Sequence, residues 1–254
     1  MLKKIGVFML ACLFVLSLAG CGGSSAPKKE EQKVLRVGME PTFPPFEFSD
    51  EKTKEFVGFD IDVMKAIGKE LGYKVEVQNL GFDALIPALE AGNIDVACSG
   101  ITITDERAKK VNFSKAYYES GLTIVVLKSN NEIKDFADLK GKKLAVQIGT
   151  TGAMEASRTE GATVREYNGL NEAYLELKNG GVDAVVNDRP VNEYFLKQGG
   201  NEYAKAVGTP KEAEEYGIAT AKKNTELAKN IDKALEAIRK NGEYQKIYEK
   251  WFSK

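Results

Sequence analysis

Apolar positions from Val34 onward alternate between a period typical of strands and a period typical of amphipathic helices. Three strands are predicted, at residues 34–38, 74–78 and 94–98. Between the first two, the apolar residues of 60–71 fall on one helical face, with Asp60 placed to cap this helix and Gly72 placed to end it. Asp83 opens a shorter helix before the third strand, so the predicted order is β-α-β-α-β.

The same order of elements recurs in the second half of the chain. Strands are predicted at residues 143–147, 163–166 and 182–186, with helices after Gly152 and through 173–178. The stretch 89–97 aligns with 177–185, each containing a helix end, a glycine stop and a strand entered through an apolar-Asp pair. A common α/β connection can produce so short a match by chance, so it supports an internal repeat without proving one.

Two such units predict an α/β protein with two lobes, each a mostly parallel sheet flanked by helices. Ligands of open parallel sheets collect outside the carboxyl ends of the strands, so two facing lobes make a cleft. The loops to inspect follow residues 38, 98, 147 and 186. Two further helices are predicted near the C-terminus, at 225–239 after a cap by Asn224 and at 243–252, where aromatic side chains form a packing stripe.

The N-terminal segment has the order of a secretory signal: Lys3 and Lys4, an apolar run over 5–18, and then small residues. Leu18-Ala19-Gly20-Cys21 resembles the bacterial lipobox, in which the cysteine is diacylated and becomes the first mature residue. The alternative is a plain signal peptide with an incidental Cys21. We therefore expect a signal peptide at 1–20, a lipidated Cys21 that opens a flexible tether over 21–32, and a folded part that begins near Lys33.

Composition narrows the function classes. The 254 residues are 43% apolar and 29% charged and include no histidine, which excludes Ser-His-Asp catalysis and His-ligated zinc and favours a binding protein over an enzyme. Removing residues 1–20 leaves 34 basic against 37 acidic residues, a formal charge of −3 without a basic stripe for nucleic acid. With Cys21 lipidated, Cys98 has no disulfide partner and is interpreted as a small buried hydrophobe.

Two of the four loops carry charged residues in suggestive positions. After the first strand, Glu40 precedes a proline-rich loop with Phe43, Phe46 and Phe48; the carboxylate could hold a polar head while an aromatic ring stacks on its stem, although each phenylalanine taken singly is more often core. In the second loop, 99–107, Thr104 is a natural helix cap and Arg107 could grip a carboxylate bidentately; the alternative is a solvent-facing arginine.

The third and fourth loops offer complementary groups. Residues 147–152 precede a helix and present free backbone amides, which favour anions, but they lack the length and the lysine of a P-loop, so nucleotide binding is not expected. Asp188 follows the last strand of the second unit and could bind an ammonium group. Its alternative role is to cap the helix that Pro190 opens.

Four short motifs together resemble the extracytoplasmic solute-binding proteins of polar amino acid ABC transporters, bacterial family 3. They lie at 58–62, 100–107, 182–185 and 248–252, and the resemblance extends from Val34 to Phe252. The lipobox agrees with the lipoprotein form of that family. The resemblance implies a two-lobed, type II periplasmic-binding-protein-like fold that closes on a free amino acid and delivers it to a membrane permease with its ATPase.

The same resemblance implies roles for individual residues. Arg107 would clamp the ligand α-carboxylate, with help from Thr102 and from backbone amides near Gly100 and Thr151. Asp188 would bind the α-ammonium group. The remaining contacts would come from Phe43 and Phe82, which sandwich the side-chain stem, from Glu40, which meets the side-chain head, and from Gln147 and Asn187, which can hydrogen-bond a carboxamide.

Family analogy places hinges near 118–122 and 216–219, so lobe 1 would consist of 33–122 plus 216–254 and lobe 2 of 123–215. The expected protein is a monomer without cofactor, metal or catalytic residues, anchored by its lipid on the extracytoplasmic side of the membrane, either at the outer face of the plasma membrane or in a periplasm. Two other readings stay open. The fold hosts dehydratases of cyclic amino acids, for which Glu40 is the candidate acid, and it also serves as a sensor, which would need a separate signalling partner because no hydrophobic span follows Cys21.

Charge balance bears on which amino acid binds. Glu40 and Asp188 against Arg107 leave the proposed site with a net charge of −1, and buried charge is costly unless it is balanced. A zwitterion with a neutral side chain leaves that charge in place, whereas arginine or lysine cancels it. Glutamine-binding relatives, as the resemblance suggests, carry a lysine where this chain has Gln147. The count therefore favours a basic amino acid over glutamine.

Overall fold

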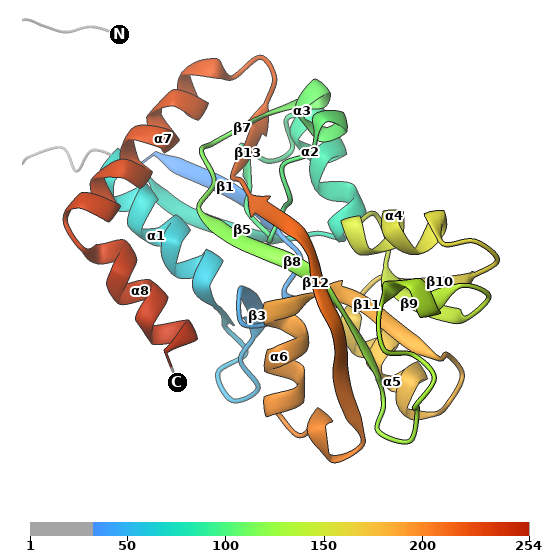
Figure 1. Ribbon diagram of the computed structural model, residues 1–254. Helices are drawn as coiled ribbons and strands as arrows, with labels where there is room; N and C mark the ends of the chain where they lie inside the picture. Colours follow the sequence, from blue (N-terminus) through green and yellow to red (C-terminus); the bar gives the residue numbers. More distant parts are fainter. Residues whose placement is uncertain (1–32, 254) are drawn as a thin grey trace, which may run out of the picture. The chain divides into compact units, whose positions relative to one another are not determined.

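The computed structural model describes residues 33–253, apart from the side chains of residues 212 and 213. The predicted signal segment 1–20, the lipidation site Cys21 and the tether 21–32 lie outside the described residues. Two five-stranded sheets, each flanked by helices, form the described part of the chain (Figure 1). We call the first sheet with its helices lobe 1 and the second sheet with its helices lobe 2.

The sheet of lobe 1 confirms the first predicted unit and adds two strands to it. Its order is β5 (Lys74–Asn79), β1 (Val34–Met39), β6 (Val96–Ala97), β13 (Ala219–Ala221) and β7 (Val111–Phe113). The first three strands run parallel to one another, and β13 is antiparallel to both of its neighbours. The predicted strand 94–98 is shortened to two residues. A small sheet of β2 (Thr42–Phe43), β3 (Glu47–Ser49) and β4 (Phe56–Val57) holds the proline-rich loop.

Helices pack on both faces of this sheet. They are α1 (Phe59–Leu71), η1 (Phe82–Ala84), α2 (Leu85–Ala91), α3 (Asp105–Lys110), α7 (Thr225–Lys240) and α8 (Glu243–Phe252). Helix α1 ends at Gly72 in the left-handed conformation, as predicted, and Thr104 caps α3 as predicted. The capping role predicted for Asp60 is wrong, because α1 is capped at Gly58 and the Asp60 side chain is fully buried. Asn224 occupies the cap position of α7 without a side-chain capping bond.

The sheet of lobe 2 repeats the arrangement. Its order is β10 (Thr163–Tyr167), β9 (Lys143–Gln147), β11 (Ala184–Asp188), β8 (Tyr118–Leu127) and β12 (Ala204–Tyr216). Strands β10, β9 and β11 are parallel, whereas β8 and β12 are antiparallel to their neighbours. The other elements of lobe 2 are η2 (Phe136–Leu139), α4 (Thr151–Arg158), α5 (Leu170–Lys178), α6 (Arg189–Lys197) and η3 (Gly200–Glu202). The predicted strand 182–186 begins and ends two residues later, as β11, and the side chain of Asp183, just before it, accepts a hydrogen bond from the Lys143 amide.

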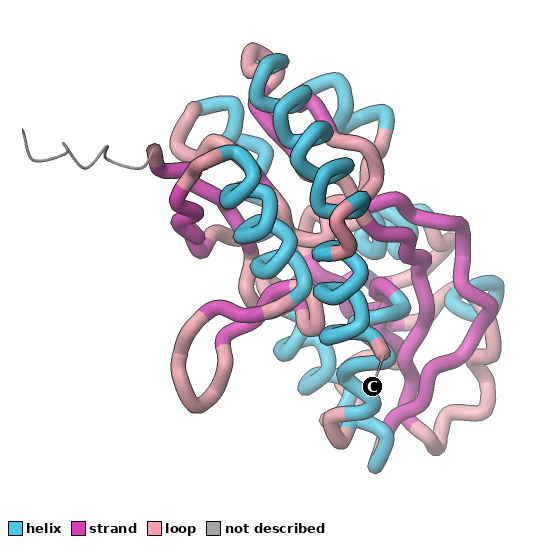
Figure 2. Tube along the Cα trace, turned by 90° about the vertical axis from the view of Figure 1, so that its left-hand side faces the viewer, coloured by secondary structure: helices cyan, strands magenta, loops and turns pink. Residues whose placement is uncertain are grey.

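Strands β8 and β12 connect the lobes as a long antiparallel pair (Figures 1 and 2). Tyr216, the last residue of β12, bridges Thr102 of lobe 1, and its carbonyl accepts a hydrogen bond from the amide of Tyr117. The predicted aromatic stripe of α8 packs against lobe 1: the ring centre of Phe59 lies 5.8 Å from that of Tyr244 and 6.3 Å from that of Tyr248. The sequence analysis placed the boundaries between the two lobes near residues 122 and 216, and these boundaries stay a prediction. Among the helices of the described residues, none has both the length and the apolar character that crossing a bilayer requires.

Candidate ligand-binding site

A narrow cavity of about 10 Å³ lies between the two lobes, where the carboxyl ends of the parallel strands of both sheets meet. Its lining residues are Phe43, Phe82, Gly100, Thr102, Arg107, Gln147, Thr150, Thr151 and Asp188. Eight of these nine are residues that the sequence predicts for the site, and Thr150 is an addition. The four loops singled out from the sequence therefore converge on one narrow cavity.

Arg107 spans the two lobes at one end of the cavity. It is 6% exposed, and its Nη1 donates to the carbonyl of Thr102 (2.8 Å) while its Nη2 donates to the carbonyl of Gly149 in lobe 2 (2.9 Å). These bonds use two of the five donors of the guanidinium and leave three for an anion. Burial lowers the pKa of Arg107, and nearby Glu214 and Asp188 oppose that shift. The alternative of a solvent-facing arginine is wrong.

Asp188 lies at the end of β11, at the N-cap position of α6, and is 4% exposed. Its side chain makes no capping bond to α6. Instead, Oδ1 accepts a weak hydrogen bond from the hydroxyl of Ser120 (3.4 Å). Burial raises the pKa of Asp188 well above its usual range, and the neighbouring Glu214 carboxylate raises it further. A cationic group of a ligand is the partner that would relieve this cost.

Aromatic rings form the apolar walls. Phe43 and Phe82 both line the cavity, and the guanidinium of Arg107 lies 5.4 Å from the centre of the Phe82 ring. Gly100 lets Phe43 approach, because a Cβ at this position would stand 2.8 Å from the ring. Its φ of +53° also belongs to the left-handed region that favours glycine. Phe46 is fully buried in the core, as the alternative interpretation of these phenylalanines predicted, whereas Phe43 lines the cavity.

Glu40 and Gln147 form a hydrogen-bonded pair at the cavity. Glu40 is 7% exposed, and its Oε2 accepts a hydrogen bond from Nε2 of Gln147 across the lobes (2.9 Å). The Thr42 hydroxyl donates to the same carboxylate. Burial raises the pKa of Glu40, and these hydrogen bonds lower it in part. Gln147 thus stands between the cavity and Glu40, and Glu40 itself is not a lining residue.

Asn187 is also not among the lining residues of the cavity. It is 2% exposed, its carbonyl accepts from Asn192, and its Nδ2 has no hydrogen-bond partner among the described residues. The role of Asn187 in ligand binding stays a prediction.

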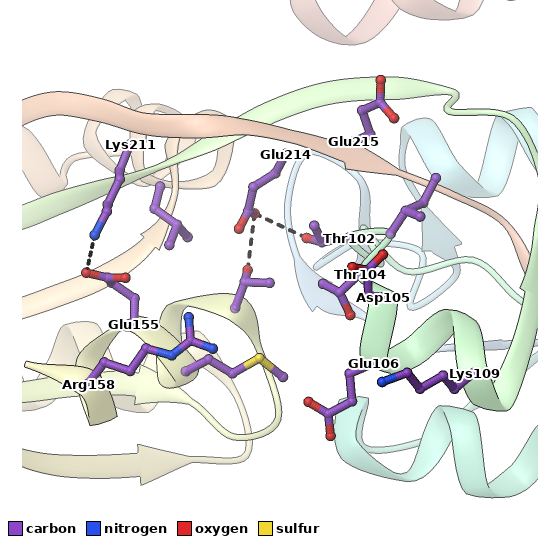
Figure 3. A pocket seen from close by; sticks show the side chains of 14 residues that line it. Thr102, Thr104, Asp105, Glu106, Lys109, Glu155, Arg158, Lys211, Glu214 and Glu215 are labelled. Carbon is purple, nitrogen blue, oxygen red and sulfur yellow. Dashed lines mark hydrogen bonds and ion pairs between the residues drawn. The ribbon is translucent and has the colours of Figure 1, made fainter.

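The sequence reasoning missed Glu214. Its Oε2 accepts hydrogen bonds from the hydroxyls of Thr102 and Thr151 (3.1 Å each), so it stands next to two residues of the cavity (Figure 3). Glu214 lies in β12, a strand that the sequence analysis did not predict, and not in a loop after a parallel strand. When Glu214 is added to Glu40, Asp188 and Arg107, the formal charge of these residues changes from −1 to −2. This change strengthens the preference for a cationic ligand.

A buried carboxyl pair supports the loop that carries Gly100. Asp60 accepts hydrogen bonds from the Gly100 amide (2.9 Å) and the Tyr117 hydroxyl (2.7 Å), and Glu47 accepts one from Ser99 (2.5 Å). Both acids are fully buried, and burial raises the pKa of Glu47 well above its usual range, with a further contribution from Asp60. Neither Glu47 Oε2 nor Asp60 Oδ1 has a hydrogen-bond partner among the described residues, so we expect Glu47 to keep its proton in the folded protein.

Replacing Glu47 with glutamine should make the stability of the protein less dependent on pH. A carboxyl group with a raised folded-state pKa stabilises the fold fully below its unfolded pKa of about 4.3, and this contribution falls by up to about 1.4 kcal/mol per pH unit as pH rises towards the folded-state pKa. The amide of Glu47→Gln is neutral at any pH and does not titrate. Urea unfolding from pH 4.5 to 8 should show the variant gaining relative to wild type, whereas exposed Glu51→Gln should follow wild type. Parallel curves for Glu47→Gln and wild type would contradict a protonated Glu47.

A second glycine permits the lobes to touch. At Gly149 (φ +75°) a Cβ would stand 3.2 Å from Cβ and 3.3 Å from Cα of Asp83 in lobe 1. The carbonyl of Gly149 is also the acceptor of Arg107. A side chain at position 149 would therefore push Asp83, and with it lobe 1, away by a few tenths of an ångström.

Gly149→Ala should weaken ligand affinity several-fold, because the added methyl group separates the lobes where Arg107 bridges them. Gly141→Ala is a matched control: Gly141 has nearly the same φ (+72°), and no atom lies within 4 Å of the Cβ. Both variants should lose about 1–2 kcal/mol of stability through the left-handed conformation. Only Gly149→Ala should lose affinity in calorimetric titration, and equal affinities would show that this contact does not limit closure.

Known proteins are similar to this chain over most of its length. The family model for bacterial extracellular solute-binding proteins, family 3, matches residues 35–254. The arginine-binding extracellular protein ArtP of Bacillus subtilis (strain 168) is 33% identical over 256 residues, which cover 99% of each chain. ABC transporter arginine-binding protein 1 of Escherichia coli (strain K12) is 37% identical over 235 residues, which cover 91% of this chain and 93% of that protein.

Solved structures are similar over most of the chain. An ancestral arginine-binding protein bound to arginine is 51% identical, with a TM-score of 0.83 over 86% of this chain and 98% of that one. A structure of an ancestral arginine-binding protein bound to glutamine is 50% identical, with a TM-score of 0.82 over 88% of this chain and 100% of that one. An ancestral amino acid-binding protein described as a precursor of cyclohexadienyl dehydratase is 42% identical, with a TM-score of 0.80 over 86% and 96%. On the family match and these relatives, the chain belongs to the bacterial extracellular solute-binding proteins of family 3.

Proposed function

We propose that the protein is a receptor for a free L-amino acid with a basic side chain, arginine or lysine in preference to glutamine, and that it delivers this ligand to an ABC permease. The observation that carries the proposal is the distribution of charge around the cavity. One buried cation, Arg107, faces three buried or half-buried carboxylates, those of Glu40, Asp188 and Glu214, so a ligand with a net positive charge reduces the formal imbalance from −2 to −1, whereas a neutral one leaves it unchanged.

The two ends of the cavity support an orientation for this ligand. Arg107 at one end suits the α-carboxylate, and Asp188 suits the α-ammonium group. The side chain would extend between Phe43 and Phe82 towards Gln147 and Glu40. The charged head of arginine or lysine would then approach the Glu40 carboxylate.

The names of the relatives support both halves of the proposal. ArtP and the ancestral protein are described as arginine-binding, and the Escherichia coli relative is described as part of an ABC transporter. Because an ancestral arginine-binding protein has also been solved with glutamine bound, glutamine is the ligand that must be compared with arginine and lysine. Attachment to the outer face of the membrane through a lipid on Cys21 is part of the proposal and is supported by the sequence Leu18-Ala19-Gly20-Cys21.

A thermal-shift panel against all common amino acids tests this function. The purified protein is unfolded, dialysed to remove carried-over ligand and refolded. A ligand that binds only the folded state raises the melting temperature by mass action. Shifts confined to arginine, lysine or ornithine support the proposal. A shift with glutamine alone refutes the charge argument, and turnover of a cyclic amino acid would support the dehydratase reading instead.

A further inference from the structure

The side-chain amide of Gln147 is held in one orientation by two acceptors. Its Nε2 donates to Oε2 of Glu40 (2.9 Å) and to the backbone carbonyl of Asn168 (3.0 Å), so both amide hydrogens are used. The reverse orientation would turn Oε1 towards a carboxylate and a carbonyl, neither of which has a hydrogen to donate. These contacts therefore decide which end of the amide is the nitrogen and which is the oxygen.

The oxygen of this amide is the polar atom that remains for a ligand. Gln147 is 1% exposed and lines the cavity, and none of the described residues donates a hydrogen bond to its Oε1. A ligand that reaches Gln147 therefore meets an acceptor. A guanidinium or ammonium head can donate to it, and a carboxamide can donate through its NH2 group, whereas a head that carries only acceptors cannot.

Glu40 is itself fixed by contacts within lobe 1. Its backbone amide donates to Oγ of Ser99 (3.0 Å), and the Ser99 hydroxyl donates to the buried Glu47 (2.5 Å). The Thr42 hydroxyl donates to both oxygens of the Glu40 carboxylate (2.8 and 2.9 Å). Because Glu40 does not line the cavity, the cavity residue that its carboxylate contacts is Gln147.

We propose that Gln147 selects the head of the ligand side chain by accepting a hydrogen bond at Oε1, and that Glu40 is a positioning residue that holds the Gln147 amide in this orientation. The inference rests on the proposed function, because it takes the cavity as the site of a free amino acid. It assigns the direct contact to Gln147, through which Glu40 acts in addition to its charge. The ligands that fit are amino acids with a hydrogen-bond donor at the end of the side chain.

Two neutral ligands of similar size separate this hydrogen bond from the effect of charge. L-Glutamine ends in a carboxamide, which can donate, whereas the sulfoxide group of L-methionine sulfoxide can only accept. In competitive calorimetric titration against arginine, wild type should bind glutamine about fivefold to a hundredfold more tightly than the sulfoxide, because the sulfoxide leaves Oε1 without a donor. Glu40→Gln should reduce this ratio by at least about threefold, because the new amide can donate to Oε1 of Gln147 and so let its Nε2 turn to the ligand.

Glu172→Gln is the matched control. Glu172 is an exposed acid of α5 whose charge acts on Glu40, and its carboxylate accepts a hydrogen bond from the Gly169 amide (3.3 Å). The variant removes a negative charge near Glu40 without touching the contacts of Gln147, so it should keep the wild-type ratio. Equal affinities of wild type for glutamine and methionine sulfoxide, or equal ratios in wild type and Glu40→Gln, overturn the inference.

A double-mutant cycle with arginine tests the positioning role separately. Gln147→Met keeps the approximate length of the side chain and offers no oxygen to the ligand. If Glu40 acts through Gln147, the loss of arginine affinity caused by Glu40→Gln should be at least about threefold smaller in the Gln147→Met background than in wild type. Equal losses in the two backgrounds overturn the positioning role of Glu40 and leave the proposed function intact. Wild type that binds no amino acid overturns the proposed function, and the inference with it.

Discussion

Arg107→Ala is expected to reduce amino acid affinity by about 30-fold to several thousand-fold, the largest loss of any single substitution in the cavity. Truncating one partner of a buried charged pair costs about 2–5 kcal/mol, and each 1.4 kcal/mol is tenfold in affinity. Alanine removes the group proposed to hold the α-carboxylate, and it also removes the bridge from Thr102 to Gly149. Isothermal titration calorimetry with arginine measures the loss.

Two further variants make the result specific. Arg107→Lys keeps the charge but not the planar fork, so it should recover only part of the affinity. Arg158→Ala removes an exposed arginine at the mouth of the cleft and should leave affinity within a few-fold of wild type. A few-fold effect for Arg107→Ala, with the fold intact by circular dichroism, would contradict its role as the carboxylate clamp.

Glu40→Gln is expected to weaken binding of arginine and lysine by about tenfold to a hundredfold and binding of glutamine by only a few-fold. Hydrogen bonds to charged groups contribute about 1.5–3 kcal/mol, roughly twice the contribution of neutral ones. The substitution keeps the shape of the side chain and a carbonyl oxygen that can accept from Gln147 and Thr42. Competitive titration of the three amino acids on wild type and variant gives the ratio directly.

Gln147→Lys provides the converse test. A lysine at this position would place a cation beside Glu40, where the structure has an amide donor at 2.9 Å. This variant should lose arginine affinity and keep or gain glutamine affinity. Equal losses for arginine, lysine and glutamine in Glu40→Gln would remove the basis of the charge-balance argument.

The loops of the binding site could be predicted because their chemistry follows from a simple rule. Parallel strands end at the same edge of a sheet, so polar residues directly after β1, β6, β9 and β11 had to converge. Arg107, Gln147, Thr151 and Asp188 were found in this way. The resemblance to the family assigned their roles, and Phe82 came from the resemblance alone.

Other features depend on contacts between distant segments, and local patterns do not contain them. Asp60 precedes a helical pattern as a cap would, but its carboxylate is used by Gly100, which is 40 residues away in the sequence. Strands β8 and β12 are antiparallel, and the βαβ pattern does not predict them. Glu214 lies in β12, so its closeness to Thr102 and Thr151 appears only after both lobes are placed.

The preference for a positively charged side chain is tested most directly by comparing arginine with citrulline on the wild-type protein. Citrulline has the same length and nearly the same shape, but a neutral urea group replaces the guanidinium. If Glu40 and the excess of carboxylates around the cavity select a cation, arginine should bind at least about tenfold more tightly in calorimetric titration at pH 7. Equal affinities for arginine and citrulline would contradict the account.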